Sequence, residues 1–163
     1  YARDKDACVA VMMLCEVASW YKKQGKTLWD AMLDMYETYG YFKEGLETIT
    51  LKGMDGAEQI QQMMADAREN LPQTIGDYKV LAVRDYKTDL RIDMADGSKS
   101  PTGLPTSNVL YYELEDHAWC CVRPSGTEPK IKFYFGVKGA SLADAEDKLE
   151  DLTKGMMALF DRK

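Results

Sequence analysis

Residues 108–137 read NVLYYELEDHAWCCVRPSGTEPKIKFYFGV, and this stretch decides the fold. Three runs within it, 108–114, 118–122 and 130–137, are rich in aromatic and β-branched residues, which predicts three strands. Only Glu115-Asp116-His117 separates the first two runs, so we expect a hairpin there. A short polar loop joins the second run to the third. These close connections predict a largely antiparallel sheet.

The flanks of this stretch add a helix and two further strands. Ser141 is a suitable N-cap for a last helix, predicted over 142–160 from apolar residues at helical spacing. Upstream, residues 78–84 and 90–94 have the composition of strands. Two glycines and two prolines interrupt residues 96–107, which we therefore expect to form a loop.

Further upstream, a strand and a helix are predicted before these elements. Residues 46–51 alternate with a period near two and contain β-branched residues, which is typical of a strand. A helix is predicted over about 57–70, and Pro72 stops it. Together the elements predict an α+β domain with a mostly antiparallel sheet of four or more strands and helices packed on one face.

Two helices precede this domain. Asp4 or Asp6 is a candidate N-cap for a helix that runs to about Tyr21, and Thr27 caps a second helix that Gly40 ends. We place the boundary so that residues 1–41 hold these helices and residues 42–163 form the α+β domain.

The first helix is unusual because residues 7–15 are apolar on every face. A surface helix has one apolar stripe, whereas a helix that is apolar all round requires neighbours on several sides. We interpret the two helices as the remainder of a truncated α/β domain. The alternative is that the first helix is the central helix of a small intact domain.

Composition narrows the classes of function. The chain has 163 residues, a formal net charge of −6 and 45% hydrophobic residues, which is typical of a globular protein. An acidic chain argues against a general nucleic-acid binder, because nucleic-acid phosphates require a basic surface. The longest apolar run is too short to span a bilayer, and no signal peptide opens the chain, so no membrane partner and a cytoplasmic location are expected.

The cysteines and the single histidine do not form a metal pattern. Cys8, Cys15, Cys120 and Cys121 include no Cys-x-x-Cys pair, and His117 has no partner at ligand spacing. We therefore expect no metal site, and we interpret the cysteines as small buried hydrophobic residues in a reducing compartment. His117 is interpreted as a solvated turn residue.

The loop between the last two strands, residues 123–132, carries candidate chemistry. Arg123 offers a planar fork that matches two phosphate oxygens, while Ser125 and Thr127 add hydroxyl donors. Gly126 can take backbone conformations closed to other residues, and it lets the backbone amides approach an anion closely. Lys130 adds a point charge. The alternative, an ordinary solvated turn, is equally compatible with the spacing alone.

The resemblance to a known family extends beyond this loop. RPSGTEPKIKFYF (123–135) resembles the phosphate-binding loop in the last domain of the α-D-phosphohexomutase family, which comprises phosphoglucomutases and phosphomannomutases. RDKDACVAVMMLCE (3–16) and KTLWDAMLDMYETYGYF (26–42) resemble helices late in the third domain of that family. GLPTSNVLYYELEDHAWCCVRPSGTEPK (103–130) is similar to the bacterial α-phosphoglucomutase subgroup.

The resemblance implies a function. It implies the C-terminal piece of an enzyme that interconverts glucose 1-phosphate and glucose 6-phosphate through a bisphosphate. In this piece the loop would hold the phosphate that is not reacting, with Arg123, Ser125, Gly126, Thr127 and Lys130 as the binding residues. We interpret Glu128 as an acceptor that shapes the loop, because a carboxylate beside a phosphate repels it.

Three motifs of the family are missing from the chain. The Thr-x-Ser-His-Asn-like, Asp-x-Asp-x-Asp-Arg-like and Gly-Glu-x-Ser-Gly segments, which hold the active serine, the magnesium and the sugar, do not occur. We therefore expect no catalytic residue here, Mg²⁺ bound outside this piece, and the N-terminal mutase domains as partners. The sugar stays open between glucose, mannose and a pentose. The alternative is a free-standing anion-binding or interaction module.

Overall fold

The computed structural model describes residues 4–51 and 55–161, which divide into two compact units. We name residues 1–41 the helical unit and residues 42–163 the sheet unit. Within the described residues, no helix combines the length and the apolar character needed to cross a lipid bilayer.

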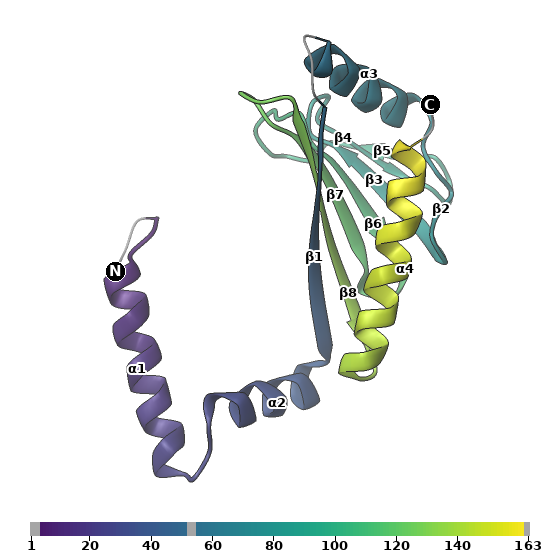
Figure 1. Cartoon of the computed structure of the whole chain (residues 1–163). Helices are drawn as coiled ribbons and strands as arrows, with labels where there is room; N and C mark the ends of the chain where they lie inside the picture. Colours follow the sequence, from purple (N-terminus) through teal and green to yellow (C-terminus); the bar gives the residue numbers. More distant parts are fainter. Residues whose placement is uncertain (1–3, 52–54, 162–163) are drawn as a thin grey trace. The chain divides into compact units, whose positions relative to one another are not determined.

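The helical unit contains α1 (Ala7–Lys23) and α2 (Leu28–Tyr39) (Figure 1). Of the two predicted N-caps for α1, Asp6 is the one used, and its carboxylate accepts a hydrogen bond from the Val9 amide at 2.9 Å. Thr27 caps α2 in a reciprocal arrangement with Asp30, in which each side chain accepts from the backbone N–H of the other. These caps explain where both helices begin.

The burial expected for the cysteines of the helical unit is wrong. Cys8 and Cys15 are both exposed, and no described residue of α1 is buried. The other helix of this unit buries Ala31 alone among its described residues. Two short helices offer too little surface to enclose each other, so the thiols of α1 face solvent.

The sheet unit has eight strands and two helices in its described residues (Figure 1). The strands are β1 (Tyr41–Thr50), β2 (Thr74–Ile75), β3 (Tyr78–Asp85), β4 (Leu90–Asp93), β5 (Lys99–Ser100), β6 (Leu110–Leu114), β7 (Trp119–Pro124) and β8 (Lys130–Gly139), and the helices are α3 (Gly56–Glu69) and α4 (Leu142–Phe160). The order across the sheet is β1-β8-β7-β6-β3-β4-β5, and β2 pairs with β3. The pairings from β2 to β8 are antiparallel, which confirms the predicted α+β class.

Three strands differ from the prediction, and one of them, the short strand β2, was not predicted at all. Strand β1 begins at Tyr41 rather than near residue 46, and a short strand, β5, interrupts the predicted loop 96–107. Gly45 belongs to a residue type that is uncommon inside strands. It faces the Leu149 side chain, where an added Cβ would lie 3.1 Å from a methyl carbon. Close packing against α4 therefore explains why a glycine occupies this position inside a strand.

The core lies between the sheet and its two helices. Alternate residues of the central strands point toward the helices and are buried. These are Leu110, Tyr112 and Leu114 of β6, Cys120 and Val122 of β7, and Ile131, Phe133, Phe135 and Val137 of β8. Ile60 and Met64 of α3 and Leu152 and Met156 of α4 join the same cluster. Both helices thus cover one face of the sheet, as predicted, and the burial predicted for Cys120 is confirmed.

The opposite face of the sheet, which we name the open face, carries polar and aromatic side chains. Trp119 and Tyr111 stack there with ring centroids 5.7 Å apart. Trp119 covers Gly136, since a Cβ at that glycine would overlap the indole nitrogen. The predicted β6–β7 hairpin closes through a short 3-10 turn, and His117 is exposed in it with φ of 62°.

Candidate functional site

The candidate loop is a tight bend between two paired strands. The register places Arg123 opposite Lys132 and Pro124 opposite Ile131. Beyond them, the Ser125 amide donates to the Lys130 carbonyl and the Lys130 amide donates to the Glu128 carbonyl, each at 2.7 Å. These bonds fix the ends of residues 125–130.

The Ser125 hydroxyl lies at the centre of this bend. Its oxygen accepts hydrogen bonds from the amides of Thr127 at 3.4 Å and of Glu128 at 3.3 Å. Two amides and one hydroxyl therefore converge on one spot, which is the arrangement of a serine turn. Both bonds are long, so an anion with stronger acceptor oxygens would compete well for these amides.

Gly126 lies on the surface of the loop, and it does not use the backbone conformations that are open to glycine alone. Gly126 does not adopt a positive φ, and a Cβ added to it would meet nothing within 4 Å. Its backbone conformation is thus open to other residues. What glycine provides here is an exposed main chain that no side chain of its own shields.

Two cations face each other where the strands enter the bend. Arg123 and Lys132 are paired across β7 and β8, so their side chains project from the same face of the sheet, which is the open face. In the described parts of the chain, neither side chain forms an ion pair. Like charges directly opposite in a sheet destabilise it, and an anion bound between them removes that cost.

Sequence reasoning missed Lys132. The signal that could have found it is the strand period of two, because Ile131 is fully buried and its neighbours Lys130 and Lys132 both point to the open face. The pairing of Lys132 with Arg123 depends on register, which the loop length sets.

Lys130 is engaged within the loop. Its ammonium donates to the Glu128 carboxylate at 3.0 Å, which agrees with the interpretation of Glu128 as an acceptor that shapes the loop. The two side chains are 34% and 57% exposed. Of the predicted binding residues, Lys130 is therefore the one whose charge is already matched by a carboxylate.

The base of the loop is held by the neighbouring elements. The Pro129 carbonyl accepts a hydrogen bond from the Leu51 amide at 3.0 Å, at the end of β1. At the start of α3, a Cβ on Gly56 would lie 3.2 Å from the Pro129 ring and 2.8 Å from the Leu51 carbonyl. A larger residue at position 56 would push against the loop, so close packing supports its position.

Cys121 is the titratable group that precedes Arg123 on the open face. Burial raises the pKa of its thiol, and the nearby charge of Arg123 opposes that rise. The thiol is consequently protonated near neutral pH and does not act as a thiolate nucleophile.

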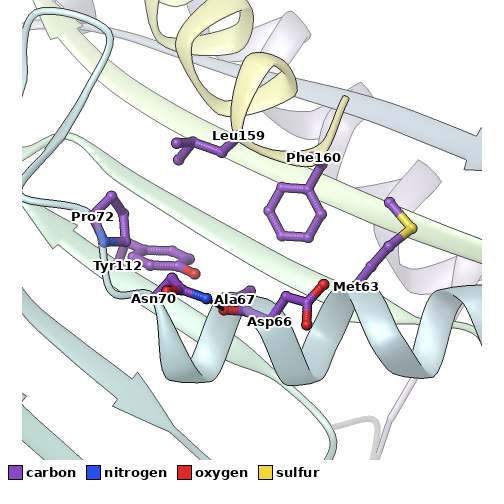
Figure 2. Close-up of a pocket in the computed structure, with 8 residues that line it drawn as sticks. All are labelled: Met63, Asp66, Ala67, Asn70, Pro72, Tyr112, Leu159 and Phe160. Atoms are coloured by element: carbon purple, nitrogen blue, oxygen red, sulfur yellow. Dashed lines mark hydrogen bonds between the residues drawn. The ribbon is translucent and has the colours of Figure 1, made fainter. Parts of the chain in front are cut away.

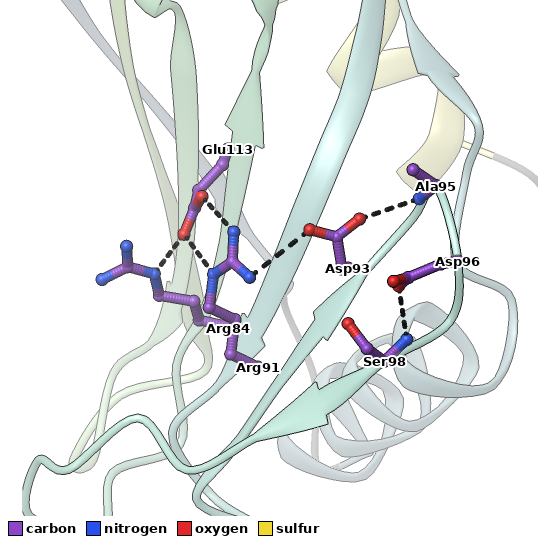
Figure 3. A network of polar contacts seen from close by, with 7 residues as sticks. All are labelled: Arg84, Arg91, Asp93, Ala95, Asp96, Ser98 and Glu113. Carbon is purple, nitrogen blue, oxygen red and sulfur yellow. Dashed lines mark hydrogen bonds and ion pairs between the residues drawn. The ribbon is translucent and has the colours of Figure 1, made fainter.

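A second polar cluster on the open face surrounds Glu113 (Figure 3). Arg91 forms two bonds to its carboxylate, at 2.9 and 3.1 Å, and Arg84 forms a third. Hydrogen bonding from Arg91 first, and then from Arg84, lowers the pKa of Glu113. Arg91 also pairs with Asp93 at 3.7 Å. Two guanidinium groups therefore face two carboxylates, and this cluster is a stabilising network between strands β3, β4 and β6.

Neighbouring aspartates shape a turn. Asp93 accepts a hydrogen bond from the Ala95 amide, and Asp96 accepts one from the Ser98 amide. Both carboxylates therefore hold the backbone of the turn in place (Figure 3). Within residues 4–51 and 55–161, no group of three or more His, Cys, Asp or Glu side chains is placed to hold a metal ion.

A pocket of about 260 Å³ lies on the helix-covered side of the sheet (Figure 2). It is lined by Met63, Asp66, Ala67, Asn70, Pro72, Tyr112, Leu159 and Phe160. Its lining is mainly apolar, and its single charged residue is an aspartate, which disfavours a phosphate. The loop 123–132 is therefore the better candidate for an anion.

Comparisons with known proteins give a consistent result. The sequence profile described as "Phosphoglucomutase/phosphomannomutase, C-terminal domain" matches residues 68–152. A phosphoglucomutase from Staphylococcus aureus (strain bovine RF122 / ET3-1) is 38% identical over 149 residues, covering 91% of this chain and 27% of its own length. A phosphoglucomutase from Staphylococcus haemolyticus (strain JCSC1435) is 35% identical over 137 residues, covering 84% and 25%.

The chain thus spans about a quarter of the length of these relatives. Among solved structures, the di-domain ARO/CYC BexL from the BE-7585A biosynthetic pathway aligns with a TM-score of 0.41 and 14% identity. That alignment covers 78% of this chain and 50% of BexL, and it is too weak to carry an argument.

Proposed function

The chain belongs to the phosphoglucomutase/phosphomannomutase family, whose C-terminal domain matches more than half of it, and we propose that residues 123–132 bind the phosphate of a phosphosugar. The single observation that carries this proposal is the placement of Arg123 directly opposite Lys132, without ion pairs among the described residues, beside a bend where amides converge. A dianion held there would satisfy both cations.

Each loop residue has a role in the proposal. The Arg123 guanidinium takes two phosphate oxygens in a bidentate contact. The Ser125 hydroxyl and the amides of Gly126 and Thr127 donate to the remaining oxygens. Lys130 and Lys132 add positive charge from the adjacent strand.

The proposal extends to a full-length protein of the size of the relatives, of which this chain would be about a quarter. That protein would interconvert glucose 1-phosphate and glucose 6-phosphate by phosphoryl transfer through a bisphosphate. This chain would hold the phosphate that is not reacting, which fixes the distance between the other end of the sugar and the phosphoryl group. Such fixing makes the transfer effectively intramolecular, and its contribution is positional.

Other components of the reaction are assigned outside this chain. The phosphoryl-carrying serine, the Mg²⁺ site and the sugar-reading loop would lie in the N-terminal domains, since their motifs are missing from this sequence. The four cysteines are free, which suits a reducing compartment, and a cytoplasmic location is part of the proposal. The chain alone, assayed with magnesium and glucose 1,6-bisphosphate, is expected to show no turnover.

Titration with glucose 1-phosphate, followed by backbone amide signals, tests the loop. We expect the signals of Ser125, Gly126 and Thr127 to move at millimolar ligand. Arg123→Ala should weaken binding about tenfold or more, because hydrogen bonds to charged groups are each worth about 1.5–3 kcal/mol. Signals that stay in place would contradict the proposal.

Lysine variants supply a matched control. Lys132→Ala should weaken binding, whereas Lys138→Ala should leave it unchanged. The Lys138 side chain projects from the same face of β8 as that of Lys132. Its ammonium lies 5.2 Å from the centroid of the Phe42 ring, and Lys138 is far along the strand from the position paired with Arg123. Equal loss in both variants would indicate a diffuse charge effect in place of a defined site.

In the full-length enzyme, Arg123→Ala should raise KM and lower kcat together. Loss of the contact weakens substrate binding, which raises KM, and a loosely held distal phosphate positions the reacting end less well, which lowers kcat. Unchanged kinetics would show that the loop does not hold the substrate.

A further inference from the structure

The two predicted cations of the loop differ in their surroundings. Arg123 forms no ion pair within residues 4–51 and 55–161, whereas Lys130 is bonded to Glu128 at 3.0 Å. One positive charge therefore faces solvent while the other is matched by a carboxylate from the same bend. A ligand that uses both cations must first break the second contact.

The backbone holds Glu128 in position for this contact. The Lys130 amide donates to the Glu128 carbonyl at 2.7 Å, which closes a turn of three residues around Pro129. The proline fixes its own φ, so little freedom is left between the two side chains. The Pro129 carbonyl is itself held by the Leu51 amide.

The contact is weak enough to be displaced. Glu128 is 57% exposed and Lys130 is 34% exposed, so water screens the pair. Exposed ion pairs of this kind are worth about 0.2–1 kcal/mol, which corresponds to a factor of about 1.4 to 5 in an equilibrium constant. A phosphate dianion carries more charge than a carboxylate and can replace it.

We propose that Glu128 is an internal competitor for Lys130, which sets the affinity of the loop for phosphate. Its carboxylate occupies the ammonium in the free protein and leaves it when a phosphate monoester binds. This inference rests on the proposed function, because it assumes that the loop binds phosphate. In the complete enzyme, such a competitor would lower the affinity of the loop for the substrate phosphate. Lower affinity would favour release of that phosphate when the bisphosphate intermediate reverses its orientation.

Removing the carboxylate without changing its size gives the direct test. In Glu128→Gln, Lys130 no longer has a charged partner, and the affinity of the loop for inorganic phosphate should rise by a factor of about 1.4 to 5. Titration of inorganic phosphate, followed at the amides of Ser125, Gly126 and Thr127, measures this change. The matched control is Asp116→Asn, which removes one negative charge from the other hairpin turn and should leave affinity unchanged.

A double-mutant cycle shows whether the effect acts through Lys130. In a Lys130→Met background, Glu128→Gln should give no gain, because the group for which the carboxylate competes is gone. A gain of equal size in that background would mean that Glu128 simply repels the anion through space, which would overturn the inference.

The outcomes separate this inference from the function on which it rests. Phosphate that moves no loop signal in the wild type or in Glu128→Gln would refute the binding role itself. Phosphate that binds the loop of the wild type, with equal or weaker binding to Glu128→Gln, would refute only the competitor. Thermal unfolding of each variant confirms that a change in affinity does not reflect loss of the fold.

Discussion

The helical unit and the sheet unit place their apolar side chains in opposite environments. In α1, Met12 is 69% exposed and Trp20 is 57% exposed. In β8, Phe133 and Phe135 are fully buried. Both units have well-defined elements, yet only the sheet unit encloses a core in the described residues.

The difference shows that caps and periodicity suffice to define helices but not to stabilise a unit. Most helical stability in proteins comes from packing of an apolar face. The sheet unit has that packing, because its two helices and its central strands share one buried cluster. We therefore expect stability to be concentrated in residues 42–163, and four predictions test this contrast.

The largest effect is expected in the core of the sheet unit. Phe133→Ala should destabilise the chain by about 3–5 kcal/mol, since a buried aromatic ring is lost and a cavity remains. Its counterpart in the helical unit, Met12→Ala, should change the free energy of unfolding by less than about 0.5 kcal/mol. Urea denaturation of both variants measures the difference, and similar losses in the two would contradict the contrast.

The next effect concerns the close approach of α4 to the chain between β2 and β3. A Cβ on Gly155 would overlap the backbone nitrogen of Gly76, so Gly155→Ala should destabilise the sheet unit by about 1–3 kcal/mol. Helix propensity alone predicts a gain of about 1 kcal/mol for the same change.

The reverse substitution in the same helix is the control. Ala158 is exposed near the end of α4, and Ala158→Gly should cost up to about 1 kcal/mol through helix propensity alone. A stabilising Gly155→Ala, measured by thermal unfolding, would show that α4 and the chain at Gly76 are not in close contact.

A smaller effect follows from the ion network of the open face. Its arginines lower the pKa of Glu113, so the carboxylate stabilises the folded state above its ordinary pKa of 4.5. That contribution begins to be lost as the pH falls below 4.5, and it is lost completely once the pH is below the lower pKa that Glu113 has in the folded state. Glu113→Gln should therefore cost less than about 1 kcal/mol at neutral pH and progressively less in acid.

Unfolding free energies measured across pH check this expectation. A Glu113→Gln variant whose deficit grows in acid would have the wrong sign and would contradict the role of the network.

The smallest effect is expected from removal of the helical unit. Deletion of residues 1–41 should leave the free energy of unfolding of the sheet unit unchanged within about 0.5 kcal/mol, because the core cluster lies entirely in residues 42–163. Loss of a cooperative unfolding transition in the shortened chain would show that the helical unit contributes to that core.

Much of the fold follows from local pattern. The caps at Asp6, Thr27 and Ser141 and the three strands around the candidate loop were all predicted from residue type and spacing. The start of β1 was missed, because glycine is uncommon inside strands and the reason for Gly45 lies in its packing against α4. The short strand β5 was missed because its pairing with β4 is a property of the assembled sheet.

The candidate site was predicted in composition but not in arrangement. Arg123, Ser125, Thr127 and Lys130 were chosen for their donors, and whether they bind phosphate stays a prediction. Local sequence did not reveal Lys132, the contact between Glu128 and Lys130, or the open backbone conformation of Gly126. Each of these depends on how two strands align.

The sequence by itself determined the α+β class, the family and the chemical character of the loop, because periodicity, caps and donor groups are local properties of the chain. Only the tertiary structure decided which cationic side chains lie opposite each other and which thiols are exposed. Cross-strand register places Arg123 opposite Lys132, and the absence of an enclosing layer over α1 in the described residues leaves Cys8 and Cys15 in solvent. Both results depend on residues that are distant in sequence, which local pattern does not encode.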